Sequence, residues 1–130
     1  MNCERFQLSK FFKFLAAALV ALFAVTALSA CASGPSIDMK SVAAVIDVRT
    51  PAEFSGGHLQ GAVNVDVEGT DFATKMGQFD KAKNYVVYCH SGRRAGIAID
   101  WMKQNGFTGA LTNAGGISDA TGATGLPIVQ

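Results

Sequence analysis

Tyr85-Val86-Val87-Tyr88-Cys89-His90-Ser91-Gly92-Arg93-Arg94 is the stretch that decides the fold. Its first four residues are apolar, which predicts a buried central strand that ends at Cys89. From Arg93 to Asn105 apolar residues recur four apart, which predicts a helix. Backbone N–H groups in a short loop before a helix converge on an anion, and the helix dipole adds to their attraction. The stretch therefore predicts a thiol inside an anion-binding loop.

This setting favours a reactive thiol. The thiolate is the nucleophilic form of cysteine, and electropositive surroundings lower the pKa at which it forms. The guanidinium groups of Arg93 and Arg94 stand beside the loop. We expect a nucleophilic enzyme that acts on small oxyanions through Cys89; the alternative is an inert, buried thiol.

The rest of the chain alternates between strand and helix signals. Thr50-Pro51 is typical of a helix N-cap followed by the first helical residue, and Gly106 suits a left-handed C-cap with Phe107 folded back onto Met102. This alternation predicts an α/β domain with a mostly parallel sheet flanked by helices, with ligands at the carboxyl ends of its strands. The segments are strands over 42–48, 62–67 and 110–111, helices over 50–57 and 71–78, a turn or short helix after Gly115-Gly116, and an extended tail over 125–128.

The N-terminal segment carries an export signal. A basic start precedes a 15-residue run, Phe14 to Leu28, that is apolar apart from Thr26. A membrane span needs about 20 residues, so the run is typical of a signal-peptide core. Leu28-Ser29-Ala30-Cys31 resembles the bacterial lipobox, whose cysteine is lipid-modified. We predict a signal peptide over 1–30, a lipidated Cys31 with a flexible tether over 31–40, and a domain over 41–130.

These features predict an exported, membrane-anchored lipoprotein that faces the periplasm or the cell exterior. Two alternatives stay open. Ala30-Cys31-Ala32 also fits ordinary signal cleavage, which would release a soluble periplasmic protein. The apolar run could also remain as an N-terminal membrane anchor.

Composition narrows the function further. The 100 residues from Cys31 onward suffice for one small domain and carry 8 basic and 9 acidic side chains, so we expect no nucleic-acid partner. After lipidation of Cys31, Cys89 is the only free thiol of the mature chain, so no internal disulfide forms. An unpaired thiol in an oxidising compartment favours a role in reactivity.

Three blocks of sequence resemble the rhodanese family of sulfurtransferases. The run 47–65 fits the pattern D-V-R-x-x-x-E-F-x-x-G-H-I-x-G-A-x-N-I nearly throughout, and the run 87–94 fits Y-C-x-x-G-x-R. Gly115-Gly116-Ile117 with Gly125-Leu126-Pro127-Ile128 resembles the closing segment. The resemblance implies a rhodanese-like fold over about 45–129, with the active-site loop between a central strand and the following helix.

The resemblance also implies a mechanism. Cys89 takes a sulfane sulfur from thiosulfate or a similar small anionic donor and passes it, as a persulfide, to cyanide or a thiol. No metal or organic cofactor is needed. Arg94 is assigned to anion binding and Arg93 to the pocket mouth. Gly92 sets the loop's geometry, while His90 and Ser91 contribute mainly their N–H groups; His90 as a general base is a weaker alternative.

Other polar residues and two departures from the family pattern bear on the site. Asp47 and Arg49 are possible supporting residues at a neighbouring strand end; the alternative is a scaffold with an Arg49–Glu53 pair.

Asp119 and Ala120 occupy the region where relatives often carry a tryptophan, so we expect a different pocket wall. Ala95 replaces a common serine. Both departures weaken the case for thiosulfate itself.

Three other functions compete with sulfur transfer. Cysteine-loop phosphatases and arsenate reductases use C-x5-R, whereas Cys89 and Arg94 give C-x4-R, a smaller loop that suits sulfur better than phosphoryl. A persulfide carrier or binding module with little turnover also fits. A thiol redox protein would need an intermolecular partner, because the mature chain has no resolving cysteine.

Overall fold

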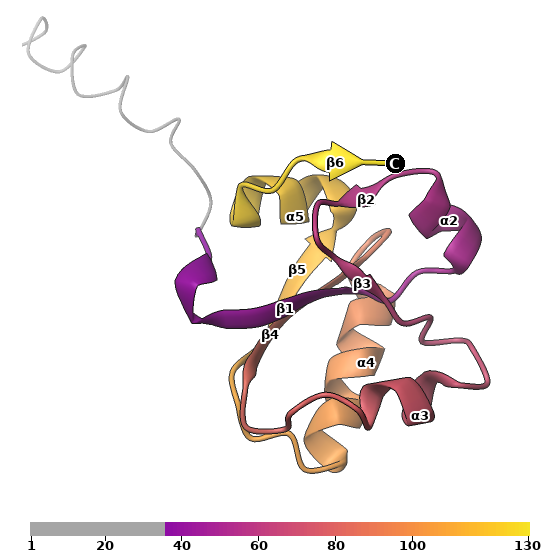
Figure 1. Ribbon diagram of the computed structural model, residues 1–130, viewed down its shortest axis with the longest axis vertical. Coiled ribbons are helices and arrows are strands. Elements are labelled where there is room, and N and C mark those ends of the chain that lie inside the picture. Colours follow the sequence, from indigo (N-terminus) through magenta and orange to yellow (C-terminus); the bar gives the residue numbers. More distant parts are fainter. Residues whose placement is uncertain (1–35) are drawn as a thin grey trace, which may run out of the picture. The chain divides into compact units, whose positions relative to one another are not determined.

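A parallel sheet organises the computed structural model, which describes residues 36–130. Its strands are β1 (Val42–Asp47), β3 (Val63–Asn64), β4 (Asn84–Cys89) and β5 (Leu111–Gly116), in the order β3-β1-β4-β5 (Figure 1). All of the neighbouring pairs run parallel. The α/β prediction with a mostly parallel sheet is thereby confirmed. The predicted signal peptide and the lipidated Cys31 lie outside the described residues.

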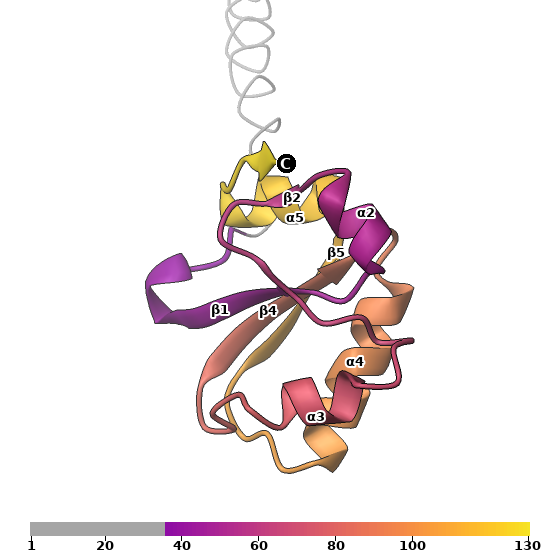
Figure 2. The same ribbon diagram turned by 45° about the vertical axis from the view of Figure 1, so that its right-hand side comes forward.

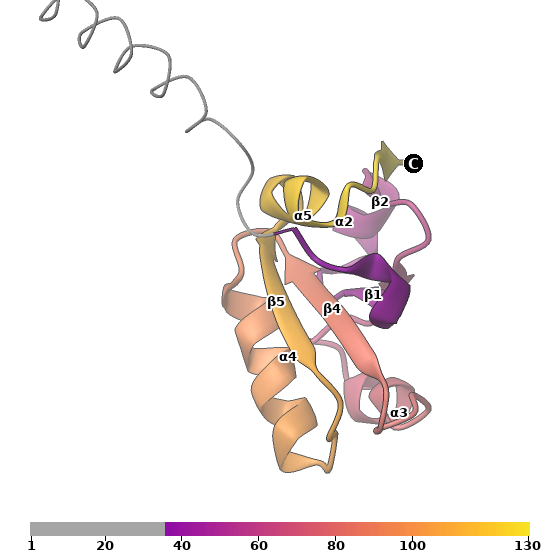
Figure 3. The ribbon, with the colours of Figure 1, turned by 90° about the vertical axis from the view of Figure 1, so that its left-hand side faces the viewer.

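Helices cover both faces of this sheet, which is why β4 reads as a continuous apolar run. Tyr85, Val87 and Cys89 face a core shared with α3 (Phe72–Met76) and α4 (Arg93–Gln104). Val86 and Tyr88 face the opposite core, which includes Ala120 of α5 (Ile117–Thr124). Figure 3 shows α4 running beside β4 and β5, with α5 at the end where these strands finish. Within residues 36–130 no helix combines the length and the apolar character needed to cross a membrane.

Two predicted helix ends are confirmed in detail, whereas the helix predicted over 71–78 covers only Phe72–Met76. Thr50 caps α2 (Pro51–Ser55) through a capping box with Glu53. At the end of α4, Gly106 has φ +89°, and the Phe107 N–H donates to the Met102 carbonyl at 3.1 Å. This is a Schellman arrangement, in which Phe107 returns to the core that contains Met102.

Several predicted boundaries are wrong at the sheet edges. The strand predicted over 62–67 covers only Val63–Asn64, although the N–H groups of Val65 and Val67 still donate to the Asp47 and Val48 carbonyls. The strand predicted over 110–111 extends to Gly116, although Thr112 and Asn113 are exposed. An exposed edge strand needs no apolar run, so its sequence signal is weak.

The pairing of the extended C-terminal tail with another strand was not predicted. β2 (His58–Leu59) and β6 (Ile128–Val129) form a small antiparallel sheet that binds the C-terminal tail to the segment after α2. At the other end, the Ile37 N–H donates to the Ala123 carbonyl at 2.8 Å. Met39–Ser41 (η2) then form a 3₁₀ turn capped by Asp38. The fold therefore begins inside the range 31–40 that was predicted as tether.

Candidate active site

The central feature of the site is the cup of backbone N–H groups around Cys89. Cys89 ends β4, between β1 and β5, and the loop 90–92 leads directly into α4. Its side chain has no exposed surface. Its Sγ accepts a hydrogen bond from the Gly92 N–H at 2.9 Å. The sulfur thus lies beneath the loop and faces amides rather than hydrocarbon alone.

This surrounding changes the acidity of the thiol. Burial raises the pKa of Cys89, but the N–H groups of Ala95, Ser91, Gly92 and Arg94 together lower it more. The pKa of Cys89 therefore lies below that of an ordinary cysteine. The start of a 12-residue helix adds the favourable end of its dipole. The predicted electropositive setting of the thiol is present.

Two glycines make the loop possible. Gly92 has φ +94°, a left-handed conformation that side chains disfavour, and a Cβ there would lie 3.2 Å from the Gly115 Cα. A Cβ on Gly116 would lie 2.4 Å from the His90 carbonyl oxygen, which is too close for any real side chain. The loop and the end of β5 therefore pack backbone against backbone.

Asn113 of β5 joins the same two segments through its side chain. Its Nδ2 donates to the Gly92 carbonyl at 3.0 Å, and its Oδ1 accepts from the Gly115 N–H at 2.9 Å. The Gly92 carbonyl also accepts from the Gly96 N–H. In a trans peptide the N–H points away from the C=O. Holding this carbonyl therefore fixes the peptide group between Gly92 and Arg93, next to the Gly92 N–H that donates to Cys89.

Arg94 is bound by a carboxylate. Its Nη1 and Nη2 donate to the two carboxylate oxygens of Glu53 at 2.8 and 2.9 Å. Thr50 donates to the same carboxylate through its N–H and its hydroxyl. Figure 2 shows α2, which carries Glu53, next to the first turn of α4. The alternative of an Arg49–Glu53 pair is wrong, because Glu53 turns to Arg94, 41 residues further along the chain.

Asp47 and Arg49 form a separate buried pair. Arg49 Nη2 lies 2.7 Å from Asp47 Oδ2, and the two side chains are 6% and 0% exposed. Arg49 also donates to the Gly57 carbonyl at 2.7 Å and lies over the Tyr88 ring. No hydrogen bond or ion pair among residues 36–130 links either side chain to the Cys89 loop. Their contacts fit a scaffold that fixes the start of β2, and a role in supporting the site stays a prediction.

The remaining predicted site residues divide into a rim and a core. His90, Ser91 and Arg93 are exposed around the buried sulfur. Ala120 lies in α5 and is fully buried in the core, whereas the different pocket wall expected from the missing tryptophan stays a prediction. Ala95 is also buried, and it contributes its N–H to the cup.

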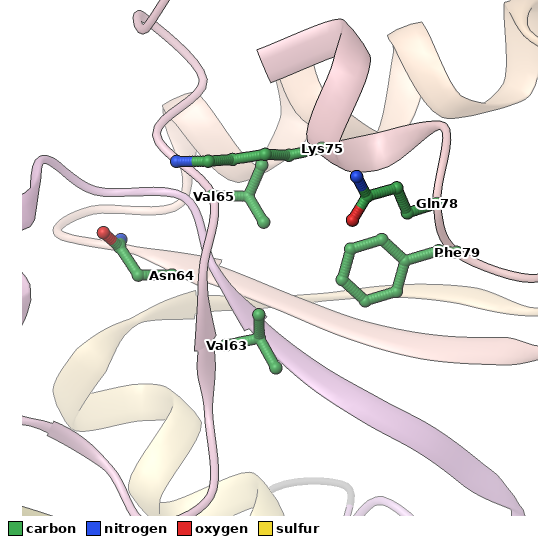
Figure 4. A pocket seen from close by; sticks show the side chains of 6 residues that line it. All are labelled: Val63, Asn64, Val65, Lys75, Gln78 and Phe79. Atoms are coloured by element: carbon green, nitrogen blue, oxygen red, sulfur yellow. The ribbon is translucent and has the colours of Figure 1, made fainter. Parts of the chain in front are cut away.

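A separate hollow lies between β3 and α3, with a volume of about 400 Å³ (Figure 4). Its lining contains no residue of the Cys89 loop, and its one charged group, Lys75, pairs with Asp71. The lining residues are Val63, Asn64, Val65, Lys75, Gln78 and Phe79. Among the described residues no cluster of histidine, cysteine, aspartate and glutamate could hold a metal ion.

Sequence reasoning missed two residues near the site, Asn113 and Glu68, and gave a third, Glu53, the wrong partner. It did not single out Asn113, although a polar side chain two residues before a Gly-Gly pair is a usable signal for a turn contact. It also assigned Glu53 to a local partner, because spacing within a helix cannot reveal a partner on another helix. Glu68, whose carboxylate lies 3.9 Å from Arg94, gave no signal.

A cysteine at the end of a central parallel strand, under a loop of convergent N–H groups, defines a class of α/β proteins with a cysteine-loop site. The family described as Rhodanese-like domain matches residues 35–123, and the chain belongs to that family. The fold agrees with that of a solved structure described as a rhodanese with anions from E. coli. That structure is 32% identical, with a TM-score of 0.56, and the match covers 67% of this chain and 96% of that one.

Two relatives carry names that describe an activity. Thiosulfate sulfurtransferase PspE of Escherichia coli is 35% identical over 57% of this chain and 70% of its own length. Thiosulfate sulfurtransferase 16 of Arabidopsis thaliana is 38% identical over 63% of this chain and 76% of its own length. A tRNA uridine(34) hydroxylase of Yersinia enterocolitica is 37% identical, but the match covers only 22% of that protein. The family thus includes sulfurtransferases, and it also supplies domains to larger enzymes.

Proposed function

We propose that this protein is a sulfurtransferase that moves a sulfane sulfur through a persulfide on Cys89. One observation carries the proposal: a buried Sγ that accepts from the Gly92 N–H, with a pKa lowered by the loop's amides. A thiolate attacks sulfur far better than a thiol does. Two relatives at 35% and 38% identity are named thiosulfate sulfurtransferases, which supports the same chemistry.

In the first step the Cys89 thiolate attacks the outer sulfur of thiosulfate or a similar donor. The new S–S bond forms as the donor's S–S bond breaks, and sulfite leaves with the bonding electron pair. Cys89 then carries a persulfide anion, and charge is conserved. Cyanide or a thiolate next attacks the terminal sulfur, which releases thiocyanate or a new persulfide and restores the Cys89 thiolate. This is covalent catalysis in two half-reactions.

The loop performs three tasks in this scheme. Its N–H groups stabilise the negative charge of the thiolate and then that of the persulfide's outer sulfur. Its exposed rim, His90, Ser91 and Arg93, meets the donor. Its C-x4-R length leaves a cradle that suits a sulfur atom better than a phosphoryl group.

Intact mass spectrometry of residues 36–130 after thiosulfate treatment tests the proposal. We expect a gain of one sulfur atom that cyanide removes, and no gain in Cys89→Ser. An unchanged mass with thiosulfate and with organic thiosulfonates would defeat the assignment. An aryl phosphate assay on the same sample checks the phosphatase alternative, for which we expect no turnover.

A persulfide carrier with slow turnover is the second candidate, favoured by the full burial of Cys89. A sulfur held beneath a loop is well protected but slow to pass on. The two functions differ in the ratio of steady-state turnover to single-turnover persulfide formation. For an enzyme we expect the rate of steady-state turnover to be comparable to the rate of persulfide formation. A carrier would form the persulfide quickly and release its sulfur slowly.

We also propose that the chain is exported and anchored through lipid on Cys31, on the strength of the run Leu28-Ser29-Ala30-Cys31. The full chain, expressed in a bacterium, should then fractionate with membranes, lose residues 1–30 and carry the mass of the lipid on Cys31. Cys31→Ser should abolish the added lipid mass and this cleavage. A wild-type protein in the membrane that keeps residues 1–30 and gains no lipid would favour an uncleaved anchor, and a cleaved, soluble wild-type protein would favour ordinary cleavage.

A further inference from the structure

Sulfur transfer from an anionic donor brings like charges together. Thiosulfate carries two negative charges and meets a thiolate that carries a third, so their encounter needs a positive group near the path of approach. The first turn of α4 offers two adjacent arginines, Arg93 and Arg94. Which of them meets the donor depends on what each side chain already binds.

The guanidinium of Arg94 is already occupied. Both of its terminal nitrogens are used by the Glu53 carboxylate, and its side chain is only 16% exposed. Glu53 is itself held by two hydrogen bonds from Thr50, and Glu68 brings a second carboxylate to 3.9 Å from Arg94. A bidentate pair uses the planar fork that would otherwise bind an oxyanion. Releasing Arg94 would also leave Glu53 without a counter-charge beside the incoming dianion.

Arg93 differs in each of these respects. It is exposed, and it is the first residue of α4. Its backbone lies between Gly92 and Arg94, two residues whose N–H groups face Cys89. Within residues 36–130 no carboxylate forms an ion pair with it and no side-chain hydrogen bond engages it. A long, unengaged cation at the rim of the cup can reach a donor while the amides hold the sulfur.

We propose that Arg93 is the anion-recognising residue of the Cys89 site, and that the guanidinium of Arg94 is committed to Glu53 and does not bind the donor. The proposal rests on the proposed function, because it assigns the contact to the donor's anionic end. The sulfonate of thiosulfate lies against Arg93 while its outer sulfur meets Cys89. Donors with a smaller negative charge depend less on this contact.

A pair of alkylating agents tests the proposal without any sulfur transfer. Iodoacetate is anionic and iodoacetamide is neutral, and both react with the Cys89 thiolate. The ratio of their rate constants cancels the thiolate fraction and the access to the buried sulfur, so it reports the charge at the mouth. His90 is kept in every variant, so its contribution cancels as well.

Three variants of residues 36–130 are compared with the wild type. Arg93→Gln removes the proposed contact. The double variant Glu53→Gln/Arg94→Gln removes both members of the ion pair and leaves the net charge unchanged. Lys103→Gln is the matched control, since it removes an exposed positive charge about 15 Å along the same helix, beyond the screening length in physiological salt.

We expect Arg93→Gln to lower the iodoacetate-to-iodoacetamide ratio by about threefold to tenfold. The double variant and Lys103→Gln should stay within about 1.5-fold of the wild type. An Arg93→Gln ratio equal to that of the Lys103→Gln control would overturn the proposal. A double variant whose iodoacetate-to-iodoacetamide ratio falls as far as that of Arg93→Gln would also overturn it. If the double variant does not fold, the comparison of the alkylation ratios of Arg93→Gln and Lys103→Gln still tests whether Arg93 recognises the anion.

A second measurement ties the contact to the donor. Arg93→Gln should raise the concentration of thiosulfate needed for half-maximal persulfide formation by about the same factor. It should raise the concentration of methanethiosulfonate, which has one negative charge fewer, by a smaller factor. An equal increase in the half-maximal concentrations of the two donors would contradict the proposal. If the wild type forms no persulfide at all, the proposed function fails, while the alkylation ratio still tests the role of Arg93.

Discussion

At the scale of single residues, the opposition between burial and hydrogen bonding decides the chemistry of Cys89. Burial alone would keep the thiol protonated and inert, as in a packed core. The amides of Ser91, Gly92, Arg94 and Ala95 reverse that outcome and lower its pKa. The same sulfur is therefore protected and ionises more readily than that of an ordinary cysteine, a combination that suits a site that must hold a reactive persulfide.

The first prediction concerns this acidity. The rate of alkylation of Cys89 by iodoacetamide should rise with pH and reach half its maximum at a lower pH than the rate for an ordinary cysteine does. The sign follows from the lowered pKa, because the thiolate persists to lower pH. The plateau rate should be lower than that of a small free thiol, since the side chain has no exposed surface. A midpoint at or above that of an ordinary cysteine would contradict the prediction; Cys89→Ser gives the background rate.

The second prediction concerns Gly92. In Gly92→Ala the new Cβ requires a left-handed residue at φ +94° and lies 3.2 Å from the Gly115 Cα. We expect the free energy of unfolding to fall by about 1–3 kcal/mol. We also expect the pKa of Cys89 to rise, because the Gly92 N–H shifts from the sulfur.

Gly122→Ala is the matched control for that substitution. Gly122 lies within α5, and a Cβ there meets nothing within 4 Å. Alanine should stabilise this helix by up to about 1 kcal/mol and leave the alkylation profile of Cys89 unchanged. Urea unfolding and the pH dependence of alkylation measure both effects. An unchanged Cys89 profile in Gly92→Ala would show that the loop's geometry does not set the acidity.

At the scale of elements, the site is formed jointly by β4, α4 and β5. β4 ends at the sulfur, α4 begins after the loop, and β5 supports the loop through Gly115-Gly116 and Asn113. Neither the strand nor the helix alone fixes the loop's peptide orientations. The hydrogen bond from Asn113 to the Gly92 carbonyl adds a side chain to this contact.

The third prediction tests the contact between Asn113 and the loop. In Asn113→Asp the carboxylate still accepts from the Gly115 N–H, but it cannot donate to the Gly92 carbonyl and repels that oxygen. We expect the pKa of Cys89 to rise, iodoacetamide alkylation at neutral pH to slow, and stability to fall by about 1 kcal/mol. Thr112→Asp places the same charge on the neighbouring exposed residue without disturbing either bond. If the two variants raise the pKa equally, charge rather than the hydrogen bond explains the effect.

The sequence predicted these elements unevenly, for physical reasons. β4 and α4 were predictable because both are buried against the core and show it in their periodicity. β3 and β5 lie at the sheet edges, where exposure removes the apolar signal. The cysteine loop was predictable from its residues, since a nucleophile, a glycine and arginines are consecutive. Glu53 and Asn113 were not, because they reach the loop from segments 41 and 21 residues away in the chain.

At the scale of the whole molecule, long-range contacts gather near the carboxyl ends of the strands. Glu53 of α2 binds Arg94 of α4, and β6 pairs with β2. These contacts join the first third of the domain to its second half and to its C-terminus. The site is therefore assembled only when the whole domain folds, and stability and reactivity share one set of contacts.

The last prediction follows from the Glu53–Arg94 pair. The Arg94 hydrogen bonds lower the pKa of Glu53 from 4.5 to about 2 in the folded protein. A carboxyl with a lowered pKa stabilises the fold above pH 4.5, and this contribution is lost as the pH falls from 4.5 towards 2. Because 32% of the Glu53 side chain is exposed, we expect Glu53→Gln to cost only about 1 kcal/mol at neutral pH.

The difference in unfolding free energy between the wild type and Glu53→Gln should therefore shrink between pH 4.5 and pH 2, which urea titrations across this range would measure. Asp71→Asn is the control, since it removes the ion pair between Asp71 and Lys75. The side chains of Asp71 and Lys75 are 56% and 49% exposed, so this substitution should change the unfolding free energy much less. A difference that stays constant down to pH 2 would mean that the carboxylate's charge contributes nothing. In that case the pair that withholds Arg94 from the donor would also lose its energetic basis, because only a charged Glu53 competes with an oxyanion for the guanidinium.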